Sequence, residues 1–400
     1  MNILQLCHRV PFPPTDGGNI AMLNLSMSLV SNGNRVKIFA LNTIKHFVNT
    51  PSLPDYFIKE MQLEAVTTDT SINPFSAFFN LFTGKSYNIS RFYNKQFEKR
   101  LKQILNENNY DVIQLESLFM LPYLSCIRKN TKAKVVLRAH NVEHIIWEQL
   151  QRSTKNRLKK WYLQLLAKRL KSYEVMHLNE LDAILPITAD DEAVFRNLGC
   201  KIPMLVTPLG INLKDYKTTT DKKTEWCLFH LGSMNWMPNQ EGVNWFLEHC
   251  WTMIHDQFPD LNLYLAGRGF PKKLAEAGYH NVICEGEISD STNYSVNKQI
   301  MIVPLLSGSG MRVKIIQGMA LAKTIISTSI GAEGIQVTNG KNILIADTPQ
   351  QFFDAVKKCM EDKYFAEQVG NAGRKLVAEK YSNEVIGKNV TGFYQRLITN

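Results

Sequence analysis

Residues 301–335 read MIVPLLSGSGMRVKIIQGMALAKTIISTSIGAEGI, and this stretch decides the fold. An apolar run over residues 299–306 has the length and composition of a buried parallel strand. Small residues follow at 307–310, and apolar residues then recur at helical spacing over 311–322. A second β-branched run occupies residues 324–327. The pattern predicts a β-α-β unit with glycines where the first strand meets the helix.

Two cations, Arg312 and Lys314, lie in the expected first turn of this helix, just after Gly308 and Gly310. Free backbone N–H groups and the positive end of the helix dipole favour an anion at such a turn. The sequence therefore predicts an anion site, and phosphate is the commonest anion to fit. The alternative is an ordinary tight turn whose cations face water.

In length and order, this stretch resembles the donor-binding segment of family-4 retaining glycosyltransferases, which are GT-B enzymes that move a sugar from a nucleotide-sugar donor. The matching residues are Pro304-Leu305, Gly308-Ser309-Gly310, Arg312, Lys314, Met319-Ala320, Ser327-Thr328 and Gly331-Ala332-Glu333-Gly334. Two positions differ: Gln317 replaces a Glu that bonds the donor ribose, and Ser309 replaces its upstream Glu. The resemblance implies that Arg312 and Lys314 stabilise the leaving diphosphate.

Length and composition indicate a globular protein of two domains. A chain of 400 residues is too long for one ordinary core, and its 44% hydrophobic and 20% charged residues fit a globular chain. No apolar run has the length of a membrane span, and residues 1–6 are expected to form a strand rather than a signal peptide. Seven scattered cysteines without a C-x-x-C pair favour reduced thiols in a cytoplasmic protein and argue against zinc.

The balance of 46 Lys+Arg against 36 Asp+Glu gives a net charge of +10, which suits phosphate ligands, an anionic membrane or nucleic acid. Nucleic acid is the least supported partner, because no motif typical of its binding appears. Residues 152–171 predict one basic amphipathic helix. Its apolar stripe either faces the core or contacts anionic lipid at the inner face of the cell membrane.

The first half alternates strands with helices, which predicts a parallel sheet covered on both faces. Its expected strands are residues 2–6, 35–41, 112–115, 134–137 and 183–187. Ligands of such sheets bind at the carboxyl ends of the strands. We therefore expect site residues in the loops after the first, third and fourth of these strands.

Gly17 and Gly18 follow the first strand, where backbone without side chains can approach a ligand. The resemblance implies that they lie beside the donor phosphates and the acceptor. Glu116 follows the strand at 112–115 and is a candidate for the acceptor side. The alternatives are a rigid surface loop for the two glycines and an exposed carboxylate for Glu116.

His140 follows the strand at 134–137, with Arg138 and Glu143 nearby on the expected acceptor side. A single histidine at a strand end is often structural. The family places a histidine here against the transferred sugar, and the resemblance implies that role for His140. An Asp pair at 190–191 is interpreted as charge at the amino end of a helix rather than as a metal site.

In the second half, strands are expected at 226–231, 262–266 and 282–284. The loops after them supply the further donor-binding candidates Gly232, Ser233, Arg268, Glu285 and Gly286. The first two could supply amides and a hydroxyl to the diphosphate, and the resemblance implies that the last two border the nucleobase. Each has ordinary turn formation as its alternative. Arg268 could face the base or the phosphates.

A polar, charged segment at 214–223 is expected to link the halves. We expect an acceptor-side Rossmann-like domain over 1–213, a donor-binding one over 224–383, and a last helix over 384–400 that packs on the first domain. The fold class is therefore α/β, as GT-B, with two Rossmann-like parallel-sheet domains facing across a cleft.

The leading hypothesis is a metal-independent glycosyltransferase of the hexosyl type. It would act on a glycan or lipid-linked acceptor in surface polysaccharide, lipopolysaccharide or glycoconjugate synthesis. Its nucleotide sugar would be a substrate, so no cofactor is expected. A sugar-nucleotide epimerase and a non-catalytic binding or scaffold protein are the alternatives. The departures from the family pattern at Gln317 and Ser309 suggest the non-catalytic protein.

Overall fold

The computed structural model describes residues 1–14, 16–72, 75, 80, 83–84, 86–218, 225–271, 274, 278–308 and 310–399. The chain divides into two compact units, unit 1 with Met1–Gly210 and Ile386–Asn400, and unit 2 with Ile211–Val385. Ile211 falls in unit 2 because it is bonded there: its N–H donates to Tyr381 O, and Asn383 N–H donates to its carbonyl, both at 2.9 Å.

Unit 1 is built on a six-stranded parallel sheet in the order β3-β2-β1-β4-β5-β6. Its strands are β1 (Asn2–Cys7), β2 (Arg35–Thr43), β3 (Glu64–Thr68), β4 (Val112–Glu116), β5 (Lys134–Ala139) and β6 (Ala183–Pro186). This is a Rossmann-like order, and its direction reverses between β1 and β4. The edge strand β3 was not predicted, because its sequence EAVTT is short and half polar.

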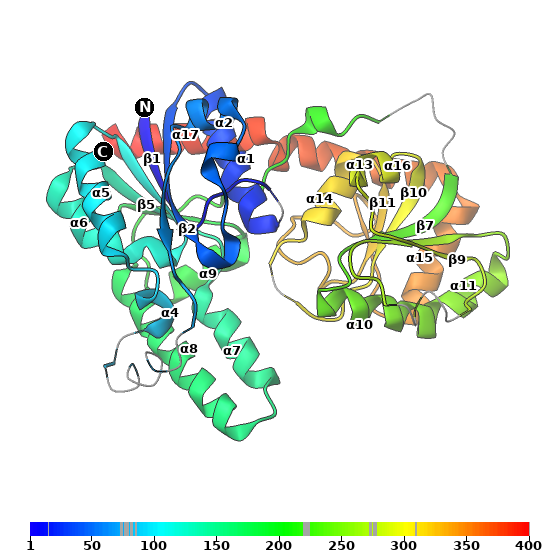
Figure 1. Ribbon diagram of the computed structural model, residues 1–400. Helices are drawn as coiled ribbons and strands as arrows, with labels where there is room; N and C mark the ends of the chain where they lie inside the picture. Colours follow the sequence, from blue (N-terminus) through cyan, green and yellow to red (C-terminus); the bar gives the residue numbers. More distant parts are fainter. Residues whose placement is uncertain are drawn as a thin grey trace. The chain divides into compact units, whose positions relative to one another are not determined.

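Helices cover both faces of this sheet (Figure 1). The apolar cluster on one face takes residues from α1 (Gly17–Ser31), α2 (Asp55–Met61) and α17 (Asn383–Thr399). The cluster on the other face takes residues from α4 (Tyr87–Ser90), α5 (Lys95–Glu107), α6 (Leu124–Asn130), α8 (Arg157–His177) and α9 (Ala189–Asn197). Because β1, β2, β4 and β5 give residues to both clusters, the sheet is buried on both sides.

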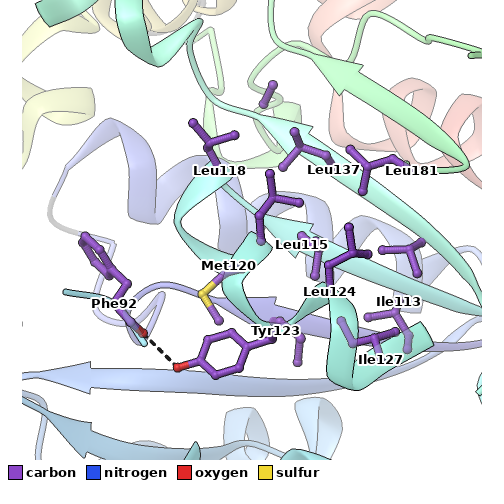
Figure 2. Close-up of a cluster of buried hydrophobic side chains, with 14 of the residues drawn as sticks. Phe92, Ile113, Leu115, Leu118, Met120, Tyr123, Leu124, Ile127, Leu137 and Leu181 are labelled. Carbon is purple, nitrogen blue, oxygen red and sulfur yellow. Dashed lines mark hydrogen bonds between the residues drawn. The ribbon is translucent and has the colours of Figure 1, made fainter. Parts of the chain in front are cut away.

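The core on the second face fixes the loop that follows β4. Figure 2 shows Leu115 and Leu137 of the sheet beside Leu118 and Met120 of a short 3₁₀ segment, Leu118–Tyr123. Tyr123 closes this cluster by donating its hydroxyl to Phe92 O at 2.8 Å. Each fully buried side chain of this size contributes roughly 1.5–3 kcal/mol. The chain just after Glu116 is therefore held by packing on one face.

The last helix, α17, lies closely against α1 within unit 1. A Cβ on Gly387 would lie 2.8 Å from Ser28 O and 2.5 Å from Asn32 Nδ2, so glycine permits this approach. Further along α17, the buried Tyr394 donates its hydroxyl to Gln114 Oε1 at 2.5 Å. The end of the chain thus completes one face of the first sheet.

Unit 2 repeats the architecture with a parallel sheet in the order β12-β11-β10-β7-β8-β9. Its strands are β7 (Glu225–Leu231), β8 (Leu263–Ala266), β9 (Val282–Gly286), β10 (Lys298–Val303), β11 (Thr324–Ser327) and β12 (Leu344–Ile345). Its helices are α10 (Met237–Phe246), α11 (Thr252–Gln257), α13 (Ser291–Ser295), α14 (Val313–Ala320), α15 (Pro349–Glu361) and α16 (Lys363–Leu376). The two sheets confirm the predicted pair of Rossmann-like folds.

One helix prediction needs correction. The basic helix expected at 152–171 is wrong, because the chain forms α7 (Glu143–Ser153) and α8 with a break at 154–156. The pair at 190–191 lies in the first turn of α9, at the amino end of the helix as predicted, and Thr188 is the cap residue that accepts from Asp191 N–H at 3.0 Å. Within the described residues, no helix combines the length and the apolar composition that a membrane span needs.

Candidate functional site

The turn between β10 and α14 requires glycine. Gly308 and Gly310 have φ of +112° and +82°, which residues with a side chain rarely adopt. A Cβ on Gly308 would also lie 3.1 Å from the Trp236 ring, so the backbone runs directly against that side chain. Ser309 lies outside the described residues.

Arg312 is the N-cap residue of α14 and is only 6% exposed. Its Nη1 donates to Gly310 O, its Cζ lies 5.4 Å from the centre of the Trp236 ring, and its Nη2 lies 3.9 Å from Glu333 Oε2. Burial lowers the pKa of Arg312, while the Glu333 carboxylate opposes that shift. The guanidinium is therefore positioned by an aromatic face at the positive end of a helix.

Lys314 is the second cation of the turn. Its Nζ donates to Asn239 Oδ1 at 2.8 Å. Burial, followed by the charge of Arg312, lowers the pKa of Lys314 to about 7. Within the part of the chain that the structure describes, this ammonium lies beside a neutral amide and a second cation and forms no ion pair with a carboxylate. An anion bound next to Lys314 would stabilise its charged form.

Gly232 directly follows β7, and because it has no side chain, the Lys314 ammonium can lie against its backbone. A Cβ on Gly232 would lie 2.4 Å from Lys314 Nζ, 2.8 Å from Asn239 Nδ2 and 3.1 Å from His230 Nε2. Burial, followed by the Lys314 charge, lowers the pKa of His230 well below its usual value, so this imidazole is neutral. Its Nδ1 donates to Ile302 O at 3.0 Å, which leaves a lone pair on Nε2.

Sequence reasoning missed His230 and Asn239. His230 lies inside an apolar strand, where a histidine is normally a core residue. Asn239 is the third residue of α10, in a stretch whose sequence resembles a turn, and Asn is common in turns. Their position could have indicated them, because β7 and the helix that follows it flank Gly232, and ligands bind at such strand ends.

The backbones of the loops after β7, β8 and β9 are bonded to one another. Gly232 N–H donates to Ala266 O at 3.0 Å, and Gly267 N–H donates to Gly286 O at 2.6 Å. A Cβ on Gly267 would lie 1.9 Å from Gly232 O, and its φ is +142°. The structure therefore brings the predicted Gly232 and Gly286 to one edge of the sheet.

The remaining donor-side candidates of these loops lie as follows. Ser233 accepts a hydrogen bond at its carbonyl from Asn239 Nδ2 at 2.7 Å. Arg268 is exposed, and its Nε donates to the exposed Glu287 Oε1 at 2.8 Å. Glu285 is exposed on the edge strand β9. In this structure the Arg268 guanidinium therefore forms a surface ion pair with the Glu287 carboxylate.

Gln317, on α14, lines a small pocket of unit 2. Its Nε2 donates to Tyr216 OH at 3.1 Å, and the Tyr216 carbonyl accepts from Arg374 Nη1 at 2.8 Å. The polar residues that line this pocket are Tyr216, Ser291, Thr292, Ser295, Lys314 and Gln317. Two of the residues predicted from one helical turn, Lys314 and Gln317, therefore share a pocket.

In unit 1, a charged cluster lies where β4 and β5 end. Glu116 is fully buried, and its Oε2 accepts from His140 Nε2 at 2.7 Å. Arg138 Nη1 lies 3.7 Å from Glu116 Oε1, and Gln114 Nε2 donates to the same oxygen. Burial alone would raise the pKa of Glu116, but the Arg138 charge and the His140 hydrogen bond outweigh it and lower that pKa. The cluster therefore holds an ionised carboxylate against His140.

His8, which was not predicted, completes this edge from the end of β1. Its Nδ1 donates to the Glu116 carbonyl at 2.8 Å, and its ring centre lies 6.2 Å from that of His140. Burial, followed by the nearby His140, lowers the pKa of His8 to about 4, so His8 is neutral. Because ionised Glu116 can only accept, His140 donates from Nε2 and its Nδ1 is the nitrogen left for a substrate.

Gly17 and Gly18 begin α1 after this edge. Asp16 caps the helix by accepting from Asn19 N–H at 3.0 Å, and Arg9 Nη1 and Nη2 donate to the Asp16 carboxylate at 2.8 and 2.6 Å. A Cβ on Gly18 would lie 2.5 Å from Arg9 Nη2. Glycine therefore allows the Arg9 guanidinium to lie over the start of the helix.

Glu143 is buried at the root of α7 rather than open to solvent. Its N–H donates to Glu174 Oε1 at 3.3 Å, and the neighbouring His144 Nδ1 lies 2.5 Å from Glu174 Oε2. Burial, followed by the charge of Glu174, raises the pKa of Glu143 from 4.5 to about 7. The Glu174 carboxylate of α8 therefore bonds to the first two residues of α7 and connects the two helices.

Replacing Glu143 with Gln is expected to flatten the pH dependence of stability. The folded chain holds a proton on Glu143 up to about pH 7, whereas the unfolded chain loses it near pH 4.5. Wild-type stability therefore falls between these values, and the variant should be more stable at pH 8 by roughly 1–3 kcal/mol. Urea unfolding at pH 4.5 and pH 8 measures this. Glu148→Gln on the same helix is the control, and an unchanged slope in Glu143→Gln would contradict the burial argument.

Two family descriptions match the sequence. The family described as Glycosyltransferase Family 4 matches residues 15–215, which is half of the chain. The one described as Glycosyl transferases group 1 matches residues 226–362. An uncharacterized 44.6 kDa protein in the cps region of Klebsiella pneumoniae is 24% identical over 262 residues. That match covers 62% of this chain and 65% of the relative's length.

Solved structures with a similar fold cover the whole chain. Sucrose-phosphate synthase from Thermosynechococcus elongatus has a TM-score of 0.72 and 16% identity, with 100% of both chains covered. Anabaena Alr3699/HepE in complex with UDP has a TM-score of 0.68 and 11% identity, covering 99% of this chain and 100% of that one. The same Anabaena protein was also solved with UDP-glucose, at a TM-score of 0.65. These likenesses support two Rossmann-like domains of the GT-B type.

Proposed function

Because the chain belongs to glycosyltransferase family 4, we propose that it transfers a sugar from a nucleoside diphosphate sugar to a glycan or lipid-linked acceptor, with retention of anomeric configuration. The observation that carries this proposal is the pair of cations at the start of α14, the buried Arg312 and the half-buried Lys314, whose pKa values are both lowered. Their charges match a diphosphate. The UDP and UDP-glucose complexes of the Anabaena protein support a donor of this class.

The proposed donor site stabilises the leaving group. Cleavage of the anomeric C–O bond develops negative charge on the diphosphate. Arg312, Lys314 and the amides of Gly308 and Gly310 would stabilise that charge, and one well-placed donor is worth about 3–4 kcal/mol of barrier. In this proposal these groups neutralise the charge of the diphosphate, so the reaction requires no metal ion.

Retention follows if the acceptor oxygen attacks the face of the sugar from which the diphosphate departs. The bond from the anomeric carbon to the phosphate oxygen breaks as the bond to the acceptor oxygen forms. The acceptor proton passes to the leaving phosphate, so no protein base is needed. In unit 1, His140 is assigned a polar contact with the sugar, and Glu116 and Arg138 hold His140 in place.

The acceptor proposed is a glycan or a lipid-linked sugar of a surface polysaccharide, made at the cytoplasmic face of the membrane. The relative from a cps region supports this pathway class. Unit 1 is assigned to the acceptor and unit 2 to the donor.

The test is a screen of nucleotide sugars for thermal stabilisation, followed by turnover with the best donor and NMR of the anomeric proton in the product. Transfer with retained configuration supports the proposal. Donor inversion without an acceptor would instead indicate an epimerase. Binding without any turnover would indicate a non-catalytic protein.

Replacing Gln317 with Glu is expected to tighten donor binding about 3- to 10-fold. A carboxylate forms stronger hydrogen bonds to ribose hydroxyls than an amide does, and tenfold in affinity is about 1.4 kcal/mol. Calorimetric titration measures the change, and Gln336→Glu, an exposed position of unit 2, is the control with the same charge. The gain should shrink with a 2′-deoxyribose donor. An equal affinity in both variants would remove the ribose role from position 317.

A further inference from the structure

The helical hairpin of α7 and α8 has an exposed apolar tip. Figure 1 shows the two helices side by side, reaching beyond the rest of unit 1. We define the hairpin tip as residues 149–161, all of which are described and at least partly exposed. Within it, Leu150, Leu158 and Trp161 are 45%, 82% and 60% exposed. Three large apolar side chains therefore face solvent at one end of the hairpin.

Among the described residues, these three side chains belong to neither apolar cluster of unit 1. The buried residues of α8 begin at Leu163 and continue through Leu166 and Leu170, and Leu170 packs in the apolar cluster on one face of the sheet. Leu158 and Trp161 lie three residues apart on another side of the helix. Large apolar side chains gathered at one exposed tip are a feature of surfaces that bind a partner.

The hairpin tip is also strongly cationic. Its basic residues are Arg152, Lys155, Arg157, Lys159 and Lys160, and residues 149–173 contain no Asp or Glu. Arg152 has one acidic neighbour on α7, with Nη2 3.9 Å from Glu148 Oε2. The tip therefore joins apolar side chains to a dense positive charge.

We propose that the hairpin tip docks on the anionic surface of a lipid bilayer. Leu158 and Trp161 would enter the boundary between headgroups and acyl chains, where tryptophan is favoured, and the surrounding cations would contact lipid phosphates. Charge complementarity favours this occupant over a second copy of the chain, because two cationic tips repel. An acidic surface without a hydrocarbon layer would leave Leu158 and Trp161 without a partner.

The hairpin is rooted at the edge of unit 1 that holds the proposed acceptor residues. Helix α7 begins three residues after His140 and spans 11 residues, or about 16 Å at 1.5 Å per residue. A lipid-linked acceptor held in the bilayer would then lie within one short helix of His140. This use of the tip rests on the proposed function, whereas bilayer docking itself does not.

The test is co-sedimentation of the full chain with phosphatidylcholine vesicles, with and without 30% phosphatidylglycerol, at low and high salt. The proposal predicts binding that requires the anionic lipid and weakens with salt. The double variants Leu158→Ser/Trp161→Ser and Lys159→Glu/Lys160→Glu should each lower the partition coefficient at least tenfold. Met176→Ser, near the other end of α8 and 66% exposed, is the matched control and should bind like wild type.

Absence of binding to anionic vesicles at low salt would overturn the proposal, as would equal binding by the tip variants. Concentration-dependent self-association that the tip variants abolish would assign the surface to a second copy and overturn it as well. The readout needs neither donor nor acceptor. Failure of sugar transfer with intact vesicle binding would therefore count against the proposed function alone.

Discussion

Replacing Lys314 with methionine is expected to lower kcat/KM for the donor about 100- to 1000-fold and to leave the fold intact. In the proposed reaction the ammonium meets the negative charge that develops on the diphosphate, and one such donor is worth about 3–4 kcal/mol of barrier. In the free protein, burial and the Arg312 charge raise the free energy of the charged ammonium, and the pKa of Lys314 is lowered for this reason. The apolar variant should therefore be as stable as wild type or more stable.

The same residue should couple donor binding to proton uptake. With a pKa of about 7, most of Lys314 is neutral at pH 8 in the free protein. A bound diphosphate raises that pKa, so binding takes up close to one proton at pH 8 and weakens as the pH rises above 7. Calorimetry with a nucleotide sugar in two buffers of different ionisation enthalpy measures this uptake. Lys314→Met should abolish it.

Lys323→Met is the matched control. Lys323 is also buried, burial lowers its pKa to about 8, and its Nζ donates to Val296 O at 2.7 Å. It precedes β11 and so lies at the amino end of that strand, away from the turns that hold Lys314. Its replacement should leave kcat/KM within about threefold of wild type. Equal losses in both variants would show a general cost of removing buried cations rather than a donor site.

Replacing His140 with alanine is expected to lower kcat about 100-fold, which is about 2.7 kcal/mol of barrier. Donor affinity should change little, because the diphosphate groups are assigned to unit 2. The variant keeps Glu116 paired with Arg138, whose Nη1 also donates to Ala21 O at 2.7 Å. A loss of activity would then not reflect an uncompensated buried charge.

Glu116 is expected to act through His140 as a positioning residue. Glu116→Gln should lower kcat in the wild-type background and add little to the loss in His140→Ala, because residues that act as a unit are not additive. Nitrogen NMR of the histidine rings supplies a readout independent of activity. It should show the proton of His140 on Nε2 in the wild type and a mixture of tautomers in Glu116→Gln. Additive losses, or an unchanged tautomer, would separate Glu116 from His140.

The elements most readable from the sequence are those set by continuous local patterns. Buried parallel strands such as β1 and β10 are short, mainly apolar stretches, and the turn after β10 places two glycines and two cations within seven residues. Both features depend on local sequence and not on contacts with distant residues. For that reason the two sheets and the cationic turn were predictable.

Features that depend on distant partners were not readable. Gln114 and Tyr394 bond across 280 residues, and no local pattern joins them. Nothing in the sequence marked Tyr216 as the partner of Gln317 either. The break between α7 and α8 lacks glycine and proline, and the cations continue across it. Asn156 was the available signal, because its side chain caps α8 by accepting from Lys159 N–H at 2.9 Å.

The course of α17 sets an order of events during synthesis. The first Rossmann-like unit lacks one of its face-covering helices until residues 386–400 have been translated, whereas the residues of the second unit form one uninterrupted segment. Until then, the first unit exposes the apolar surface that α17, with Gly387 and Tyr394, later covers. Loss of this helix would therefore leave an apolar face of the N-terminal unit uncovered, although the two segments are far apart in the sequence.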